Sequence, residues 1–561
     1  MIMANKMITV TVKDGKEAGG VKEFHYGTKL IEVADEFSQV CSHSILIAKV
    51  NNELCELYKE LTDDCEIEFF DFTNPNGLRV YQRSVSFLMI YAAKEILGKK
   101  TRVIIEHSIN KNYYCEIDFD GKITADLLKQ IKSKMLEAVE ADLKIEKRSV
   151  TVEESLKLAE QFGLYDKIKT MNYRRTSNVN LYKLDWFYDY FYGQMAFSTG
   201  RTPHFTLVKE GNGFMLCFPA VKNGEEIRIG HDENGYKKIT NVFKESGKWA
   251  KILKADTVGA LNDIISSGET GRFIMTNEAL HEKRIGQIAD KISQQGKNIV
   301  LIAGPSSSGK TTFAERLSVQ LRVNGLLPHV ISLDNYYRNR SEVPLEADGK
   351  PNLEAVSALD TELLNEHLAL LIKGHAIEIP RFSFVTSSRE KGEMLELNDD
   401  SVLIIEGIHG LNDKLTEAIP AENKFKIFIS ALTQLNIDDH NRIPTTDTRL
   451  IRRIVRDNQF RNHDAEKTIA IWPSVTRGED EYIFPFQENA DAFFNSALVY
   501  EMCVLKQYAE PLLFKIQKSS EQYIEARRLV KFLDGFLGIS SEDVPKNSIL
   551  REFVGGSFFN V

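Results

Sequence analysis

The sequence is poor in cysteine and has no long apolar segment. Its six cysteines include no CxxC pair and no short, regular spacing: Cys41, Cys55, Cys65, Cys115, Cys217 and Cys503. Such scattered thiols argue against a zinc site or a disulfide scaffold and favour reduced cysteines in a cytoplasmic protein. The longest apolar runs, such as residues 85–93, reach about half the length of a membrane span, so we expect no membrane partner. No basic segment followed by an apolar one opens the chain, so we expect no signal peptide.

The chain also lacks an excess of positive charge. It has 71 Lys and Arg residues against 80 Asp and Glu residues, a formal net charge of −9. Proteins that coat nucleic acids neutralise phosphates with Lys and Arg, so the composition disfavours that class but leaves room for local basic patches. Hydrophobic residues (43%) and charged residues (27%) occur at globular levels, and 561 residues predict three or four domains.

Residues 1–72 have the pattern of a small α+β domain. Residues 7–13 alternate apolar and polar side chains, as strands do, and a second strand follows a Gly-Gly turn. A short amphipathic helix over residues 30–38 and further strands complete the pattern. Residues 50–70 resemble the TGS domain, the ubiquitin-like β-grasp module at the head of threonyl-tRNA synthetases. The resemblance predicts a β-grasp fold for this region.

Residues 75–240 predict a second α+β domain, which begins with a helix over residues 84–97. The order of strands and helices resembles the second additional domain that follows TGS in threonyl-tRNA synthetases. That family edits mischarged tRNA with histidines four residues apart on one helix. Here Arg83, Phe87 and Tyr91 fall at those positions, so we expect no editing and infer a retained scaffold or a binding module.

From residue 277 to about residue 517, strands rich in Ile, Val and Leu alternate with helices. This alternation predicts an α/β domain with a parallel sheet. Residues 518–561 add a helix and an irregular tail. The tail, residues 549–561, carries two glycines and an apolar end that we expect to dock on the protein, at a place that the sequence does not give. The predicted fold class is therefore multidomain: two α+β domains followed by one α/β domain.

A complete phosphate-binding loop of the form GxxxxGK[ST] lies between a predicted strand, residues 298–303, and a predicted helix. Its glycines let the backbone wrap around phosphates, and its N–H groups point inward at a helix N-terminus. We expect an ATP site made of Gly304, Pro305, Ser306, Ser307, Ser308, Gly309, Lys310, Thr311 and Thr312. Lys310 can reach the terminal phosphates and Thr311 can contact Mg²⁺. A degenerate loop that binds nucleotide without turnover is the alternative.

Two acidic residues follow predicted strands near this loop. Asp334 ends the strand after the loop's helix and is positioned to accept a proton from an attacking alcohol. Glu406 ends a buried strand, where an acid acts on Mg²⁺ or its waters. The alternatives are a surface carboxylate in a turn for Asp334 and a capping residue for Glu406. We expect Thr311, Glu406 and Asp334 to form the metal site.

Five segments in order resemble the uridine kinase/phosphoribulokinase family, and most closely its uridine kinases: residues 304–312, 332–337, 379–389, 403–409 and 447–457. With the two N-terminal regions, the whole chain resembles long bacterial nucleoside kinases fused to synthetase-like domains. The resemblance implies a P-loop kinase that uses ATP and Mg²⁺ to phosphorylate the 5′-hydroxyl of a nucleoside. It assigns the catalytic base to Asp334 and the phosphate contact to Lys310.

The same resemblance implies a nucleoside pocket. It places Tyr337 in the pocket wall, Glu354 at the ribose hydroxyls, and Phe382 and Phe384 on either side of the base. Aromatic faces suit a flat heterocycle, but both phenylalanines can equally be core residues. Where the family carries polar groups that read a pyrimidine edge, this chain has Ser383 and Ser387, and Ala355-Val356 replaces a His-Pro pair. Uridine is therefore the default acceptor, with other nucleosides open.

A predicted helix over residues 447–461 carries five arginines: Arg449, Arg452, Arg453, Arg456 and Arg461. Such a density of positive charge requires anionic partners, and phosphoryl transfer needs cations around the migrating phosphate. The resemblance implies that Arg453 and Arg456 belong to the nucleotide lid and the ribose side of the site, and that Arg453 is also catalytic. It implies that Arg461 closes over the phosphate. A solvated basic face or an RNA-contact strip is the alternative.

Two further functions stay open at this point. One is a nucleotide-gated protein that binds RNA or tRNA through its synthetase-like half. The other is a P-loop kinase of another small alcohol, such as a sugar phosphate. Phe382 and Phe384 disfavour this function, because a sugar phosphate offers no aromatic ring to stack on. We also expect the protein to form a homo-oligomer.

Overall fold

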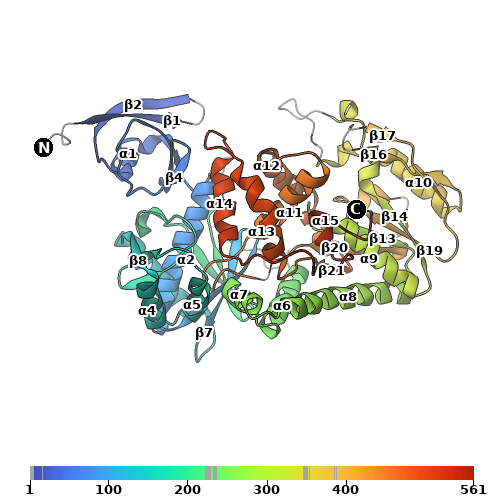
Figure 1. Ribbon diagram of the computed structural model, residues 1–561, viewed down its shortest axis with the longest axis horizontal. Coiled ribbons are helices and arrows are strands. Elements are labelled where there is room, and N and C mark those ends of the chain that lie inside the picture. The colour runs from blue at the N-terminus through green and yellow to red at the C-terminus, as the bar shows by residue number, and fades with distance from the viewer. Residues whose placement is uncertain are drawn as a thin grey trace.

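Two lobes and a central group of helices make up the molecule (Figure 1). The computed structural model describes residues 6–14, 17–220, 229–230, 237–344, 352, 354–383, 386, 388–417, 419–433 and 435–560. The N-terminal half lies on the left of Figure 1 and the α/β half on the right, with α13 (Glu501–Phe514) and α14 (Tyr523–Asp534) between them. No described helix has the length and apolar character that crossing a membrane requires.

The first domain is a mixed sheet of five strands in the order β2-β1-β5-β3-β4. Strand β1 pairs in parallel with β5, while the other neighbours are antiparallel. One face of the sheet packs on a helix through buried residues such as Val10, Val33 and Ile67. Its elements are β1 (Met7–Asp14), β2 (Glu17–His25), α1 (Leu30–Glu36), η2 (Ser38–Val40), β3 (Ile47–Val50), β4 (Glu53–Cys55) and β5 (Cys65–Phe70).

The second region has two antiparallel sheets, β11-β12-β7-β6 and β10-β9-β8, and a long buried helix, α2 (Pro75–Leu97). This helix begins nine residues before the predicted start because the Asn74 side chain caps it and Pro75 suits its first turn. The other elements are β6 (Arg102–Ile109), β7 (Asn112–Asp118), α3 (Ala125–Glu140), β8 (Ile145–Thr151), α4 (Val152–Phe162), α5 (Tyr165–Asn172), β9 (Asn178–Leu184), β10 (Phe187–Asp189), η3 (Thr199–Arg201), β11 (Thr206–Glu210) and β12 (Gly213–Cys217).

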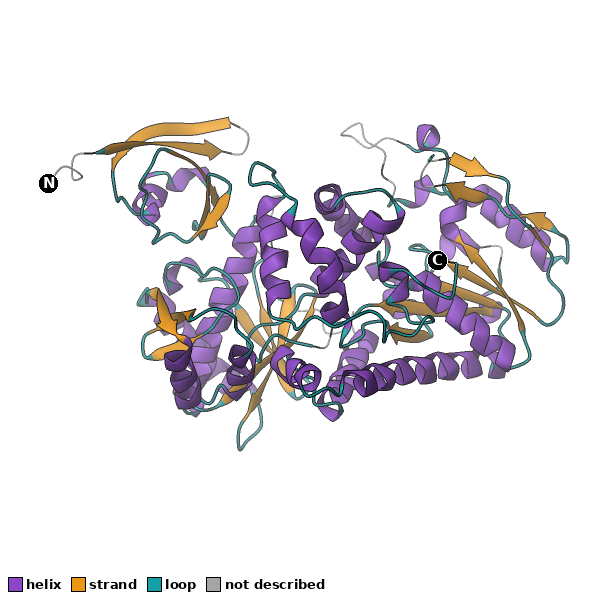
Figure 2. Ribbon diagram, in the orientation of Figure 1, coloured by secondary structure: helices purple, strands orange, loops and turns teal. Residues whose placement is uncertain are grey.

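The α/β half is built on five parallel strands in the order β14-β19-β13-β20-β21. Figure 2 shows helices packed around this sheet. The parallel sheet, together with the mixed and antiparallel sheets of the N-terminal half, confirms the predicted fold class. The strands of the sheet are β13 (Ile299–Ala303), β14 (Leu327–Ser332), β19 (Ser401–Glu406), β20 (Lys424–Ser430) and β21 (Ala492–Asn495).

The helices and short strands of this half surround the sheet. Its first three helices and the turns between them span residues 241–276, which the predicted domains leave out. The elements are α6 (Lys237–Ile252), α7 (Val258–Ser266), α8 (Thr270–Gln294), α9 (Lys310–Val323), η4 (Leu333–Tyr336), η5 (Arg340–Glu342), η6 (Val356–Ala358), α10 (Thr361–Ile372), β15 (Ile377–Glu378), β16 (Arg381–Ser383), β17 (Ser388–Glu390), β18 (Met394–Leu395), η7 (Asp413–Thr416), η8 (Ala421–Asn423), α11 (Thr445–Phe460), α12 (Ala465–Tyr482), η9 (Phe484–Asn489) and α15 (Arg551–Val554).

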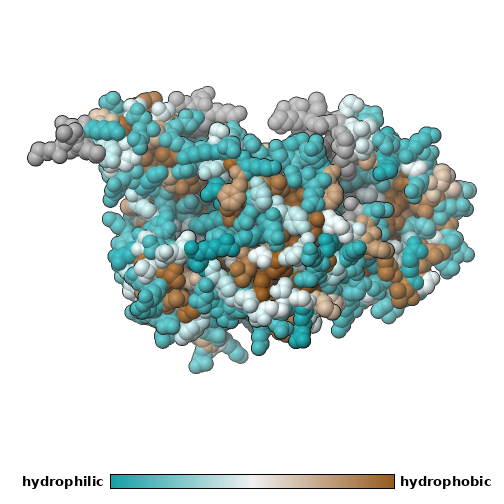
Figure 3. Space-filling view, in the orientation of Figure 1, coloured by the Kyte–Doolittle hydropathy of each residue, from teal (hydrophilic) through white to brown (hydrophobic). Residues whose placement is uncertain are grey.

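One hydrophobic cluster joins the parallel sheet to the end of the chain. It includes Ile302 and Ile427 in the sheet, Phe313 in α9, Leu529 in α14 and Phe553 in α15. The C-terminal segment is therefore part of the α/β core. On the surface, the face seen in Figure 3 is mostly hydrophilic, with scattered hydrophobic patches.

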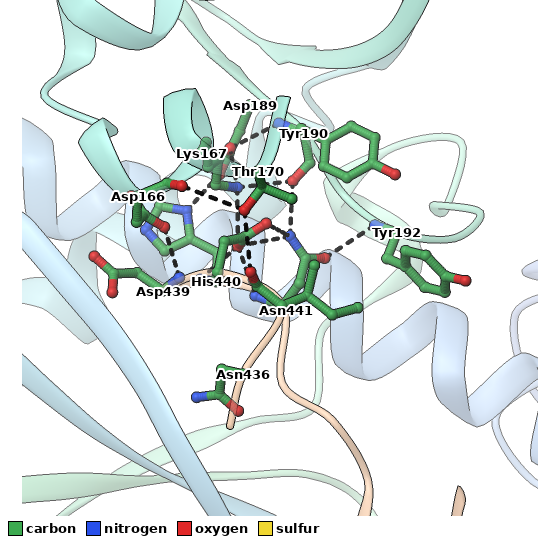
Figure 4. Close-up of polar contacts among 12 residues, drawn as sticks. Asp166, Lys167, Thr170, Asp189, Tyr190, Tyr192, Asn436, Asp439, His440 and Asn441 are labelled. Atoms are coloured by element: carbon green, nitrogen blue, oxygen red, sulfur yellow. Dashed lines mark hydrogen bonds and ion pairs between the residues drawn. The ribbon is translucent and has the colours of Figure 1, made fainter. Parts of the chain in front are cut away.

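A buried polar network joins the two halves (Figure 4). Lys167 of α5 contacts Asp189 of β10 and lies 3.5 Å from Asp438, which belongs to the loop between β20 and α11. His440 of the same loop approaches Asp189 with its Nδ1 atom, 2.6 Å from Oδ2. All four side chains are buried. The loop that leads into α11 is thus anchored in the N-terminal half.

A chain of ion pairs makes a second connection to α11. Arg79 of α2 pairs with Glu525 of α14, at 3.1 Å. Glu525 also pairs with Arg528 one turn along the helix, and Arg528 donates two hydrogen bonds to Asp447 in the first turn of α11. The start of α11 is therefore fixed by the N-terminal half from two sides.

Replacing Lys167 with methionine should destabilise the protein by about 3–5 kcal/mol, because it removes the lysine that buried Asp189 and Asp438 share and leaves Asp189 paired with His440. Urea unfolding followed by circular dichroism measures the loss. The matched control is Lys157→Met, which removes an exposed helical pair with Glu153 and should leave the midpoint unchanged. Equal midpoints for both variants would contradict the structural role of the network.

Candidate active site

The phosphate-binding loop follows β13 and precedes α9, as predicted. Its glycines are required by space and backbone: a Cβ atom on Gly304 would lie 2.0 Å from the Ile429 carbonyl oxygen, and Gly309 has φ +83°. Ser307 and Ser308 are buried, and no described group hydrogen-bonds to their hydroxyl oxygens. A loop with unmatched hydroxyl groups and exacting glycines fits a polyphosphate.

Lys310 folds back over this loop. Its Nζ atom donates to the carbonyl oxygens of Gly304 at 3.1 Å and Pro305 at 3.4 Å. Burial lowers the pKa of Lys310, although the carboxylates of Glu406 and Asp334 oppose the shift. The Lys310 ammonium group is therefore bound to backbone carbonyl oxygens, and the charges of Glu406 and Asp334 act on it.

Two acids meet at the carboxyl ends of adjacent parallel strands. Glu406 ends β19 opposite Ser332, the last residue of β14, and Asp334 lies two residues further on. Burial, with the neighbouring charge of Asp334, raises the pKa of Glu406 to about 7. Thr311 donates to Glu406 Oε1 at 3.3 Å. The three residues predicted for the metal thus lie together.

The oxygen atoms of this group are ligands that Mg²⁺ prefers. Among the described residues no cluster of three or more His, Cys, Asp or Glu side chains could hold a metal. Magnesium in nucleotide sites is usually bound by one or two carboxylates with phosphate oxygens and water, so a pair of acids beside a phosphate loop fits it. Burial and the charge of Asp334 raise the pKa of Glu406, and the charge of Lys310 opposes the shift only in part, so the site favours a further positive charge.

Part of the predicted nucleoside pocket lies beside Asp334. The rings of Tyr337 and Phe382 are 5.7 Å apart between centroids and inclined by 52°. Burial raises the pKa of Glu354 to about 7. The positive charge of Arg453 opposes this shift, and the negative charges of Glu479 and Asp334 add to it. Burial together with Asp334 and Glu354 also raises the pKa of Tyr337. Phe384 and Ser387, predicted as its neighbours, lie outside the described residues.

Arg389 braces this pocket, a role the sequence analysis missed. Its guanidinium donates to the carbonyl oxygen of Tyr337 at 3.1 Å and to Asp360 at 3.1 Å. The backbone N–H of Arg389 donates to Asn339. The only sequence signal was the arginine at the end of the segment 379–389.

The arginine helix is α11, and two of its arginines have carboxylate partners on neighbouring helices. Arg449 forms a two-pronged contact with Glu479 of α12, and Arg452 pairs with Glu501 of α13. Both arginines are buried. The prediction that the density of arginines reflects the phosphate is therefore corrected for these two: their charge is matched by acids from neighbouring helices.

Arg453 contacts the phosphate loop, and Arg456 lies one turn further along α11. Arg453 donates to the Ser306 hydroxyl oxygen at 2.9 Å and to Asp457 at 3.1 Å. Asp457 is buried, yet Arg456, Arg453 and Arg461 hold its pKa below the usual value. These three arginines, all predicted for the nucleotide site, therefore share one buried acid.

Glu479 is a further residue that sequence reasoning missed. Its carboxylate accepts from the backbone N–H of Ser306 at 2.9 Å, while Arg449 donates to the Ser306 carbonyl oxygen at 3.2 Å. The Arg449–Glu479 pair thus clamps both sides of one residue of the loop. A single glutamate in a helical segment gave no sequence signal for this contact.

These features define a P-loop kinase: a phosphate loop, two strand-end acids and an arginine helix over a parallel sheet. The family model for the Phosphoribulokinase / Uridine kinase family matches residues 299–501. The uridine kinase of Proteus mirabilis is 34% identical over 200 residues, which cover 34% of this chain and 84% of that kinase. That of Ureaplasma parvum is 31% identical over 194 residues, 34% of this chain and 85% of that kinase. The chain belongs to the phosphoribulokinase/uridine kinase family.

The N-terminal half is similar to a different class of protein. The threonine–tRNA ligase of Clostridium kluyveri is 28% identical over 196 residues, which cover 35% of this chain and 30% of the ligase. The chain thus spans about 30% of the length of this ligase. The predicted fusion of a synthetase-like region with a kinase is confirmed.

The raised pKa of Glu406 predicts a pH-dependent loss of stability. A carboxyl with a folded pKa of about 7 and an ordinary value of 4.5 destabilises the folded chain progressively as pH rises through that interval. Glu406→Gln cannot ionise, so at pH values near 8 its free energy of unfolding should exceed the wild-type value by about 3 kcal/mol. Near pH 4.5 the two should agree. Urea unfolding at both pH values tests this, and a less stable variant near pH 8 would contradict it.

Proposed function

We propose that this kinase transfers the terminal phosphoryl group of ATP to the 5′-hydroxyl of a nucleoside, with uridine as the default acceptor. The observation that carries the proposal is the position of Asp334. It lies two residues after the end of β14, shares the sheet edge with Glu406, and is followed three residues later by Tyr337, whose ring packs near Phe382. A carboxylate base lies beside an aromatic surface, which suits a nucleoside, because its ribose carries both a hydroxyl and a flat heterocycle.

In the proposed reaction Asp334 accepts the proton of the acceptor hydroxyl. That oxygen forms a bond to the terminal phosphorus as the bond between phosphorus and the bridging oxygen breaks, and ADP leaves. Lys310 and Arg453 place positive charge beside the loop where negative charge collects. Glu354 is proposed to hold the ribose hydroxyls.

Thr311, Glu406 and Asp334 would hold Mg²⁺. When bound, the ion neutralises phosphate charge and draws electrons from the phosphorus. On the protein side, Glu406 must lose its proton, because its raised pKa leaves much of it neutral near pH 7. Binding of magnesium and nucleotide is therefore coupled to proton release.

The acceptor is decided by an ATP-consumption screen with uridine, cytidine, inosine, guanosine, adenosine and simple sugars. Stimulation of ADP release by at least one nucleoside supports the proposal. Stimulation by sugars alone would point to another small alcohol. RNA binding by the N-terminal half stays a prediction, and an RNA arm of the same screen tests whether RNA stimulates ADP release.

Asp334→Asn should lower kcat for the best nucleoside by about 10²–10⁴-fold, because the amide cannot accept the proton. ATP should still bind with similar affinity, since the phosphate loop is untouched. Steady-state kinetics and calorimetry measure the two effects. Near-wild-type turnover in this variant would remove Asp334 from the role of base.

Phe382→Ala should raise KM for the nucleoside about tenfold or more, because stacking on a base contributes about 1–3 kcal/mol. KM for ATP should stay the same. The control is Phe460→Ala, which alters an exposed phenylalanine at the end of α11. An unchanged nucleoside KM in Phe382→Ala would identify Phe382 as a core residue.

A further inference from the structure

The C-terminal tail docks on the phosphate loop. It runs from Ser548 through α15 to Asn560, and Figure 1 shows α15 beside α11 and the C-terminus close to this side of the sheet. Ile549, Leu550 and Phe553 are fully buried. The Phe553 ring lies 5.0 Å from the guanidinium of Arg452 on α11. The segment for which the sequence gave no position thus covers the site.

Ile549 of the tail makes an apolar contact with the phosphate loop itself. A Cβ atom on Gly309 would lie 2.5 Å from Cγ2 of Ile549. Gly309 also has φ +83°, so glycine is required here both by the backbone and by the tail. The tail therefore rests directly against the residue that precedes Lys310.

An acidic residue of the tail, Glu552, makes a polar contact with the start of α9. Glu552 is buried, and its Oε2 atom accepts from the Thr312 hydroxyl at 2.9 Å and from the Thr312 backbone N–H at 3.4 Å. Its other oxygen lies 3.8 Å from Arg456. Backbone N–H groups at this end of a P-loop helix are those that receive nucleotide phosphate. A carboxylate of the chain thus occupies a position suited to a phosphate oxygen.

We propose that residues 548–560 form an anionic plug of the nucleotide site, in which Glu552 stands in for a phosphate oxygen at Thr312 and must be displaced when ATP binds. The carboxylate and a phosphate compete for the same donors and repel each other. Arg456 is a second partner toward which the displaced carboxylate can turn. The proposal rests on the proposed function only in taking ATP as the ligand; it requires no particular acceptor.

Calorimetric titration of the full-length chain with ATP and Mg²⁺, without any acceptor, tests the plug. Glu552→Gln keeps the shape of the side chain and removes its charge, so Kd for ATP should fall about tenfold. The control is Glu542→Gln, an exposed glutamate of the preceding turn, which should leave Kd unchanged. An equal or larger Kd in Glu552→Gln overturns the proposal and makes Glu552 a supporting cap of α9.

A second measurement uses the wild-type chain, so it does not depend on a variant that folds. Amide hydrogen exchange of residues 548–555 should become faster when ATP is added, and slower or unchanged exchange overturns the plug. If ATP binds more tightly to Glu552→Gln but no nucleoside is phosphorylated, the proposed function fails and the plug stands. If neither protein binds ATP, both fail.

Discussion

The burial of the guanidinium groups of α11 is the constraint on which the rest of the α/β half depends. An unpaired charge in such a position costs several kcal/mol, so each buried arginine fixes the element that supplies its partner. Arg449 fixes α12 through Glu479, and Arg452 fixes α13 through Glu501. Both also donate to carbonyl oxygens of the phosphate loop, at Ser306 and Ser307. The loop therefore owes its shape to a helix more than 130 residues away in sequence.

The same helix links the kinase to its synthetase-like half. The loop before it is held by Lys167 and His440 in the buried network, and its first turn is held by the relay from Arg79 to Asp447. Buried ion pairs tolerate little displacement, because their attraction must offset a large desolvation cost. The N-terminal half therefore contributes the buried contacts that fix the start of α11, the helix whose arginines contact the phosphate loop.

Sequence reasoning succeeded where chemistry depends on local spacing. The positions of the phosphate loop, Asp334 and Glu406 were predicted because each sits at a fixed offset from a buried strand, and parallel strands bring such ends together, while their chemical roles stay predictions. It failed where the partner comes from afar: Glu479 and Glu501 carry no local signal, and neither does the docking of Glu552 on Thr312. The start of α2 was missed because its cap, Asn74, precedes a segment with little apolar periodicity. Long-range pairs are the part of the site that one sequence leaves undetermined.

The charged groups of the site find partners within the chain itself. Lys310 is bonded to loop carbonyl oxygens, Arg453 and Arg456 lie beside Asp457, and Glu552 faces Thr312. Burial next to Asp334 keeps Glu406 partly protonated near pH 7. In the proposed reaction nucleotide and Mg²⁺ would replace these contacts, and each replacement would exchange one charged or polar partner for another of the same kind. Such an exchange costs less than exposing unmatched buried charge, because the site is already polar and arranged for an anion. Asp457 and Glu552 therefore hold the arginines, and loop carbonyl oxygens hold Lys310, in an arrangement that suits the proposed phosphate ligand.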